Sequence, residues 1–135
     1  MNLTKNFPRS TYDMNAGIAM LPRTTDKARA HNEGKLGEYH YNCPLDKQVL
    51  EFYGIDSETF ARKVKELKTD EKIAEWLNKS YPKSQAEKDK FNNMMRHSKP
   101  HDENGRSYFE SEKKRLGRSD FSTWFDYLDA DEKRF

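Results

Sequence analysis

The chain has 135 residues, which is the size of one domain, and no linker rich in Pro, Gly or Ser divides it. Hydrophobic residues make up 33% and charged residues 36%, so the core must draw on the 13% of aromatic residues, each of which buries a large area. The net charge of +2 is far below the basic surplus of proteins that hold nucleic acid mainly through its phosphates.

The sequence shows no export signal, membrane span or disulfide framework. The first residues contain no apolar run followed by a cleavage site, and nowhere do about 18 apolar residues follow one another. The single cysteine, Cys43, cannot form a disulfide within the chain. We therefore expect a protein that works reduced in the cytoplasm, with no contact to a membrane.

The first predicted elements are two helices separated by a proline corner. Met14, Ile18 and Leu21 are spaced i, i+4 and i+7, which predicts a short helix that Pro22 ends. A second helix is expected over residues 24–32, capped by one of its first two threonines.

The middle of the chain predicts one loop and three helices with short turns. Residues 36–43 are expected to be an ordered loop, because one extended run has no second strand to pair with. Pro44 suits the first turn of a helix that ends near Gly54. Ser57 and Thr69 are then the expected caps of the next two helices.

The last third predicts three more helices. A capping box begins a helix at Ser84 that ends before Pro100, and the polar residues 98–105 are expected to be a mobile loop. Residues 108–116 form the next helix, and an apolar stripe over 121–128 indicates a C-terminal helix that docks on the core. The predicted fold is all-α, an irregular bundle of about six to eight short helices in a single domain over residues 1–135.

Three blocks of the sequence carry a family resemblance. They are Leu21-Pro-Arg with Asp26-Lys-Ala-Arg-Ala, then Leu36-Gly-Glu-Tyr-His-Tyr-Asn-Cys-Pro-Leu-Asp46, then Gly117-Arg-Ser-Asp-Phe-Ser-Thr-Trp-Phe-Asp-Tyr-Leu-Asp129. In this order and spacing they resemble a bacterial family of domains of unknown function, DUF5069, over nearly the whole chain. The resemblance implies no activity. This chain ends at Phe135, whereas family members often continue with a few apolar and glycine residues.

Cys43 is the strongest candidate for a catalytic residue. It precedes the expected helix at Pro44, and a thiol at a helix N-terminus is favoured as a nucleophile. His40 lies close in sequence and could act as acid or base. The alternative is that Cys43 is a small buried hydrophobe. Alternation along an extended segment would also turn His40 away from Cys43.

A ligand pocket is the second candidate. Two polar segments of the sequence would form this pocket, and the residues proposed to line it are Arg23, Asp26, Lys27, Arg29, Tyr39, Tyr41 and Asp46. Guanidinium groups hold carboxylates or phosphates bidentately, so a small anion fits this set. The alternative is that Asp26 and Arg29 form an i, i+3 surface ion pair and that Arg23 anchors a loop.

No metal or cofactor site is expected. The four histidines lack a metal-binding spacing, and no cofactor motif is present. The basic segment 113–118 is diluted by glutamates and is interpreted as a solvated helix end. The short turn between Gly54 and Ser57 resembles helix-turn-helix connectivity, but the second helix has a mixed charge face, so nucleic acid is not the expected partner.

Three hypotheses of function follow. The first is a non-enzymatic module that binds a small anionic molecule or a protein. The second is a cofactor-independent enzyme that uses Cys43 or His40 on a small metabolite. The third is nucleic-acid binding through residues 113–118.

Overall fold

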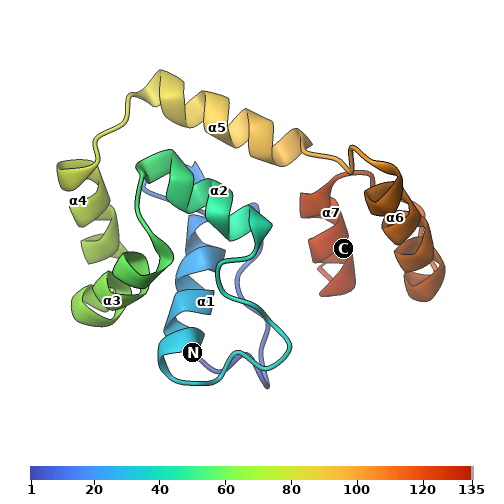
Figure 1. Cartoon of the computed structure of the whole chain (residues 1–135), viewed down its shortest axis with the longest axis horizontal. Helices are drawn as coiled ribbons and strands as arrows, with labels where there is room; N and C mark the ends of the chain where they lie inside the picture. Colours follow the sequence, from blue (N-terminus) through green and yellow to red (C-terminus); the bar gives the residue numbers. More distant parts are fainter. Residues whose placement is uncertain (135) are drawn as a thin grey trace.

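The computed structural model describes residues 1–134, and over these residues the chain forms seven α-helices and one small β-hairpin (Figure 1). The helices are α1 (Leu21–Asn32), α2 (Pro44–Tyr53), α3 (Ser57–Leu67), α4 (Asp70–Ser80), α5 (Gln85–His97), α6 (Glu103–Leu116) and α7 (Trp124–Asp131). The predicted all-α class and the predicted number of helices are confirmed. None of the helices formed by residues 1–134 combines the length and the apolarity that crossing a bilayer demands.

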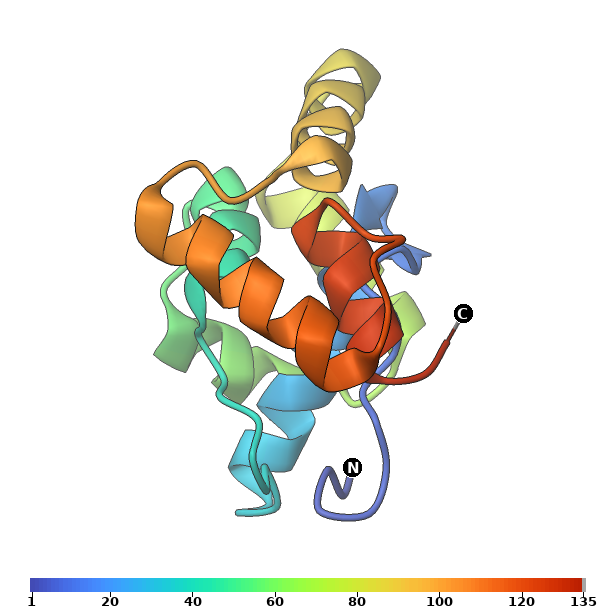
Figure 2. The same cartoon turned by 90° about the vertical axis from the view of Figure 1, so that its right-hand side faces the viewer.

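Helix α1 lies in the middle of the molecule. It contacts α2, α3 and the hairpin, and α4 packs on α3 at one side (Figure 1). Helix α5 runs along the top from α4 to the pair formed by α6 and α7, and it contacts α7 and the hairpin. Figure 2, turned by 90°, shows α6 and α7 crossing in front of the rest. The central position of α1 explains why so much of it is buried.

The prediction of a helix over residues 14–21 is wrong. Strands β1 (Met14–Asn15) and β2 (Ile18–Ala19) pair antiparallel in its place. The two residues between the strands, Ala16 and Gly17, have φ values of 53° and 77°. Positive φ at both positions is the mark of a type I′ hairpin turn, which glycine permits at little cost. The turn chemistry thus outweighed an apolar spacing that also fits a helix.

Helix α1 starts earlier than predicted. Pro22 lies in its first turn, where a missing N–H leaves no helical hydrogen bond unmade, and so it begins the helix and does not end one. Both expected caps are inside the helix. The Thr24 hydroxyl donates to Asp46 at 2.8 Å, and the Thr25 hydroxyl donates to the carbonyl of Leu21 at 2.8 Å.

Most other helix ends agree with the prediction. Pro44 is in the first turn of α2, Thr69 caps α4, and Ser84 forms the capping box of α5. Helix α3 is capped by Asp56, which accepts from the Thr59 N–H at 2.7 Å, and the expected cap Ser57 is the first helical residue. A carboxylate one residue earlier satisfies the same helix end.

The polar stretch 98–105 is only partly a loop. Asp102 accepts from the Gly105 N–H at 2.7 Å and starts α6 at Glu103, so the connection is residues 98–102. The glycine that suggested a loop lies in the first turn of the helix, where the cap offsets its low helix propensity.

The core has two parts that α7 joins. The larger cluster spans the hairpin and helices α1 to α5 and includes Phe60, Leu77 and Phe125. The smaller cluster lies between α6 and α7 and is built on Phe109 and Tyr127. Because Phe125 and Tyr127 lie on the same helix but in different clusters, the C-terminal helix docks on both, as its apolar stripe predicted.

The hairpin is tied to α5 by one buried amide. Asn92 is 4% exposed, and its Oδ1 accepts from the Ala19 N–H at 2.8 Å. Its Nδ2 donates to the Gly17 carbonyl at 2.9 Å. The Ala19 N–H is thereby satisfied where water is excluded, whereas the Gly17 carbonyl lies at an exposed turn.

Replacing Asn92 should therefore destabilise the fold. Asn92→Ala leaves the buried Ala19 N–H without a partner, at about 1–3 kcal/mol, whereas water can replace the amide at the exposed Gly17 carbonyl. We expect urea denaturation to show a loss of about 1–3 kcal/mol in unfolding free energy. The neighbouring Asn93 is exposed, and Asn93→Ala is the control, expected to stay within about 0.5 kcal/mol of the parent. Equal effects of the two variants would contradict this role.

Candidate functional site

Three charged residues of α1 are buried and Arg29 is partly exposed, although all four were predicted to wall an open pocket or lie on the surface. Arg23, Asp26 and Lys27 are 2%, 4% and 4% exposed. A buried charge is stable only when it is paired and hydrogen-bonded. The partner of each therefore determines what the site can do.

Arg23 is bound by a glutamate from the C-terminal end of the chain. Its Nη1 and Nη2 donate to the two carboxylate oxygens of Glu132 at 2.8 and 2.7 Å. The Tyr39 hydroxyl donates to the same carboxylate at 2.7 Å, and Arg134 also donates to it. Residues from α1, from the loop before α2 and from the segment after α7 thus meet on one carboxylate.

The pKa values of this group follow from its burial and its hydrogen bonds. Burial raises the pKa of Glu132, but the hydrogen bond and charge of Arg23 outweigh it, and the net shift is downward. The pKa of Tyr39 is raised, first by burial and then by its hydrogen bond to Glu132. Glu132 is therefore ionised and Tyr39 is a neutral donor near neutral pH.

Asp26 and Arg29 belong to a second network that includes Arg9 and Asp70. Arg9 donates from Nη2 to Asp26 at 3.0 Å and from Nη1 to Asp70 at 2.6 Å. Arg29 donates to Asp70 at 3.0 Å and to Asp26 at 3.4 Å. The i, i+3 pair between Asp26 and Arg29 is present, but Arg9 makes the closer contacts with Asp26 and links α1 to the start of α4.

Lys27 holds the third network, which contains the cysteine. Its Nζ lies 2.7 Å from Asp46 Oδ2 and donates to Cys43 Sγ at 3.2 Å. Asp46 is fully buried and also accepts from the Thr24 hydroxyl at 2.8 Å and from the Asn42 N–H at 3.1 Å. The structure thus brings a thiol, an amine and a carboxylate from two helices together.

The remaining predicted residues of the loop have other positions. His40 is exposed, and within residues 1–134 no hydrogen bond or ion pair joins it to Cys43. The Tyr41 hydroxyl donates to the Ser57 carbonyl at 2.6 Å, and its ring lies 5.2 Å from that of His31. Tyr41 therefore fastens the loop to α3.

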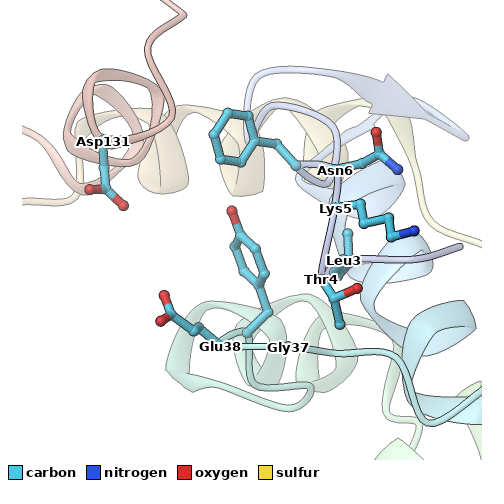
Figure 3. Close-up of a pocket in the computed structure, with 9 residues that line it drawn as sticks. Leu3, Thr4, Lys5, Asn6, Gly37, Glu38 and Asp131 are labelled. Atoms are coloured by element: carbon cyan, nitrogen blue, oxygen red, sulfur yellow. The ribbon is translucent and has the colours of Figure 1, made fainter.

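A cavity of about 860 Å³ lies beside the first of these networks (Figure 3). Three segments contribute its lining, which consists of Leu3, Thr4, Lys5, Asn6, Phe7, Gly37, Glu38, Tyr39 and Asp131. Of the residues proposed from the sequence, it contains Tyr39 alone. Figure 3 shows Glu38 and Asp131 on one side and Lys5 directed to the other side. These residues are far apart in sequence, and no motif could have grouped them.

Gly37 brings two walls of the cavity together. It has a φ of 62°, and a Cβ at this position would lie 3.0 Å from the Leu3 carbonyl oxygen. Glycine is therefore required both by the backbone conformation and by the close approach of the N-terminal segment. The Leu3 N–H donates to the Lys35 carbonyl at 2.9 Å and holds the same two segments in place.

The basic segment 113–118 is largely paired with acidic groups. Lys113 lies 3.4 Å from Glu110, and Arg115 lies 2.7 Å from Glu112. The hydrogen bond of Arg115 lowers the pKa of Glu112 to about 2. A shallow hollow of about 330 Å³ lies at the end of α6 among these side chains. Over residues 1–134, no cluster of three or more His, Cys, Asp or Glu could hold a metal ion.

The buried pair of Arg23 and Glu132 gives a stability prediction. Glu132→Leu leaves a guanidinium buried without its counter-ion, which costs about 3–5 kcal/mol. The double variant Arg23→Met with Glu132→Leu removes both charges and should lose much less, as urea denaturation would show. Glu110→Leu removes an exposed partner and serves as the control, with an expected change below about 1 kcal/mol. A double variant as unstable as Glu132→Leu would refute the pairing argument.

The lowered pKa of Glu132 also predicts the response to acid. A glutamate in the unfolded chain has a pKa of about 4.3. The stability that Glu132 contributes is therefore present above that pH, and it is lost as the pH falls toward the lower pKa that Glu132 has in the folded protein. At pH values below about 4 we expect the urea concentration at the unfolding midpoint to decrease, and to decrease less steeply with pH in the Glu132→Leu variant than in the parent. Identical pH profiles of the two proteins would show that another group controls acid unfolding.

Comparison with known proteins identifies the family. A search of curated proteins gives no match. The family model described as "Domain of unknown function (DUF5069)" matches residues 5–134, which is nearly the whole chain. The match includes all three networks and seven of the nine residues that line the cavity. The chain therefore belongs to the DUF5069 family.

Proposed function

We propose that the protein is a non-enzymatic binding module whose ligand is a small organic cation held in the cavity of about 860 Å³. The observation that carries the proposal is the lining, in which the rings of Phe7 and Tyr39 occur together with the exposed carboxylate of Glu38. The second carboxylate of the lining, Asp131, lies 2.5 Å from Arg115 and is already paired. Aromatic faces attract cations through the ring quadrupole, and a carboxylate adds the counter-charge. The single cysteine of the protein is free, which suits the reducing cytoplasm, and we propose the cytoplasm as the location of the protein.

The charges near the cavity favour a cation over the anion expected from the sequence. Arg23 and Lys27 each already hold a carboxylate in a buried pair, and Arg29 holds one in a partly exposed pair, so an anion would have to displace a carboxylate of the chain. Glu38, by contrast, is exposed, and within residues 1–134 it has no hydrogen bond or ion pair. Lys5 is the one basic residue in the lining.

Two contacts within the chain support the affinity of these rings for cations. The guanidinium carbon of Arg134 lies 5.9 Å from the centre of the Phe7 ring, and that of Arg23 lies 5.7 Å from the centre of the Tyr39 ring. Phe7 nevertheless remains 52% exposed, which leaves ring surface for a ligand.

An enzyme that uses Cys43 is the second candidate. Its support is the contact of Sγ with the Lys27 amine, because a nucleophile, a base and an orienting carboxylate are the parts that covalent catalysis needs. Cys43 lines neither of the two cavities described above, so a place for a substrate is the missing part.

Calorimetric titration with amines, guanidines and quaternary ammonium compounds tests the binding proposal. We expect binding that weakens with salt and that weakens about fivefold in Phe7→Leu and in Glu38→Gln, since a partly exposed cation–π contact or ion pair contributes about 1 kcal/mol. Glu58→Gln, on the exposed side of α3, should bind as the parent does, and so should Cys43→Ser. Binding of carboxylates or phosphates without binding of cations, or no binding at all, would refute the proposal.

A further inference from the structure

The contact between Lys27 and Cys43 joins a reactive group of α1 to one at the residue that precedes α2. Lys27 Nζ lies 3.2 Å from Cys43 Sγ, although the residues are 16 positions apart in sequence. Lys27 is 4% exposed, whereas Cys43 is half-buried at the N-terminal end of α2. Cys43 is therefore the more accessible residue of the pair, and Lys27 is the buried one.

The amine cannot easily leave this position. Asp46 holds Nζ at 2.7 Å and is itself held by the Thr24 hydroxyl at 2.8 Å and by the Cys43 N–H at 3.3 Å. An intramolecular reaction between groups fixed at contact distance is favoured, because the entropy of bringing them together has already been lost on folding.

We propose that Cys43 and Lys27 form a reversible covalent sulfur–nitrogen cross-link when the protein meets a hydroperoxide. In the first step the thiol reduces hydrogen peroxide to water and becomes a sulfenic acid, which gains one oxygen atom. In the second step the neutral amine attacks the sulfur, a sulfur–nitrogen bond forms, and the sulfenic hydroxyl leaves as water with one amine hydrogen. The product is a sulfenamide, and sulfur has lost two electrons to the peroxide.

The carboxylate beside the amine completes the proton balance. The Lys27 ammonium must lose a proton before it can attack, and Asp46 Oδ2 is 2.7 Å away to accept it. The cross-linked state then contains an uncharged nitrogen and a protonated carboxyl group. No buried charge is left without a partner, which would otherwise oppose the reaction.

Competing fates of the sulfenic acid are few. Cys43 is the only cysteine in the sequence, so no second thiol of the chain can form a disulfide with it. The next lysine, Lys47, is one helical turn away and exposed, and no contact joins its side chain to Cys43 within residues 1–134. Lys27 is therefore the amine that is positioned to react with the sulfenic acid of Cys43. This proposal does not rest on ligand binding at the cavity.

Peptide mapping of the peroxide-treated, folded chain tests the cross-link. Modified Lys27 resists trypsin, so digestion should give peptide 24–29 joined to peptide 36–47, with two hydrogens fewer than the separate peptides together. A thiol reductant added before digestion should restore cleavage after Lys27 and release peptide 36–47 with a free thiol. The same map from untreated protein should contain only separate peptides.

Two variants make the test specific. Lys27→Arg should lose the joined peptide and accumulate sulfinic and sulfonic acid at Cys43, whereas Lys47→Arg should retain the joined peptide at the level of the parent. Circular dichroism shows whether Lys27→Arg folds, and if it does not, the parent map decides alone. Sulfinic acid without a joined peptide in the folded parent, or a join to Lys47, would overturn the proposal.

Discussion

The structure depends on the pairing of charges that α1 carries into the interior. Arg23, Asp26 and Lys27 follow one another along a helix in the middle of the molecule, where water cannot solvate them. Removing a charge from water costs several kcal/mol, and the cost is recovered only if an opposite charge arrives in good geometry. Each of the three has such a partner, and the partners come from distant segments.

These pairs determine how the chain closes around α1. Glu132 brings the segment after α7, Asp46 brings the first turn of α2, and Arg9 brings the N-terminal segment and, through Asp70, the start of α4. Apolar packing is not directional, so it holds the helices together without selecting one arrangement. Buried ion pairs tolerate little misplacement, so they select one arrangement of the helices. In any other arrangement the same charged residues would be buried without a partner, which would destabilise the fold.

The same pairing explains why the polar residues of α1 do not form an open site. The Arg23 guanidinium is 2% exposed and already holds both oxygens of Glu132, so its burial closes it to a ligand anion. The cavity lies beside Tyr39, between the N-terminal segment and the Gly37 turn. Cys43 differs from the other members of the networks because it carries a thiol, whose redox chemistry pairing does not neutralise.

The sequence by itself determined the helical class, most helix boundaries and the docking of the C-terminal stripe, because caps, prolines and apolar spacing are local signals. It also singled out Lys27, Cys43 and Asp46, but in two different sites. Only the tertiary structure decided that these three meet, that Arg23 pairs with Glu132, and that residues 14–19 form a hairpin. A pairing between residues 109 positions apart leaves no periodic trace in either segment, and an apolar spacing that fits a helix does not exclude a turn.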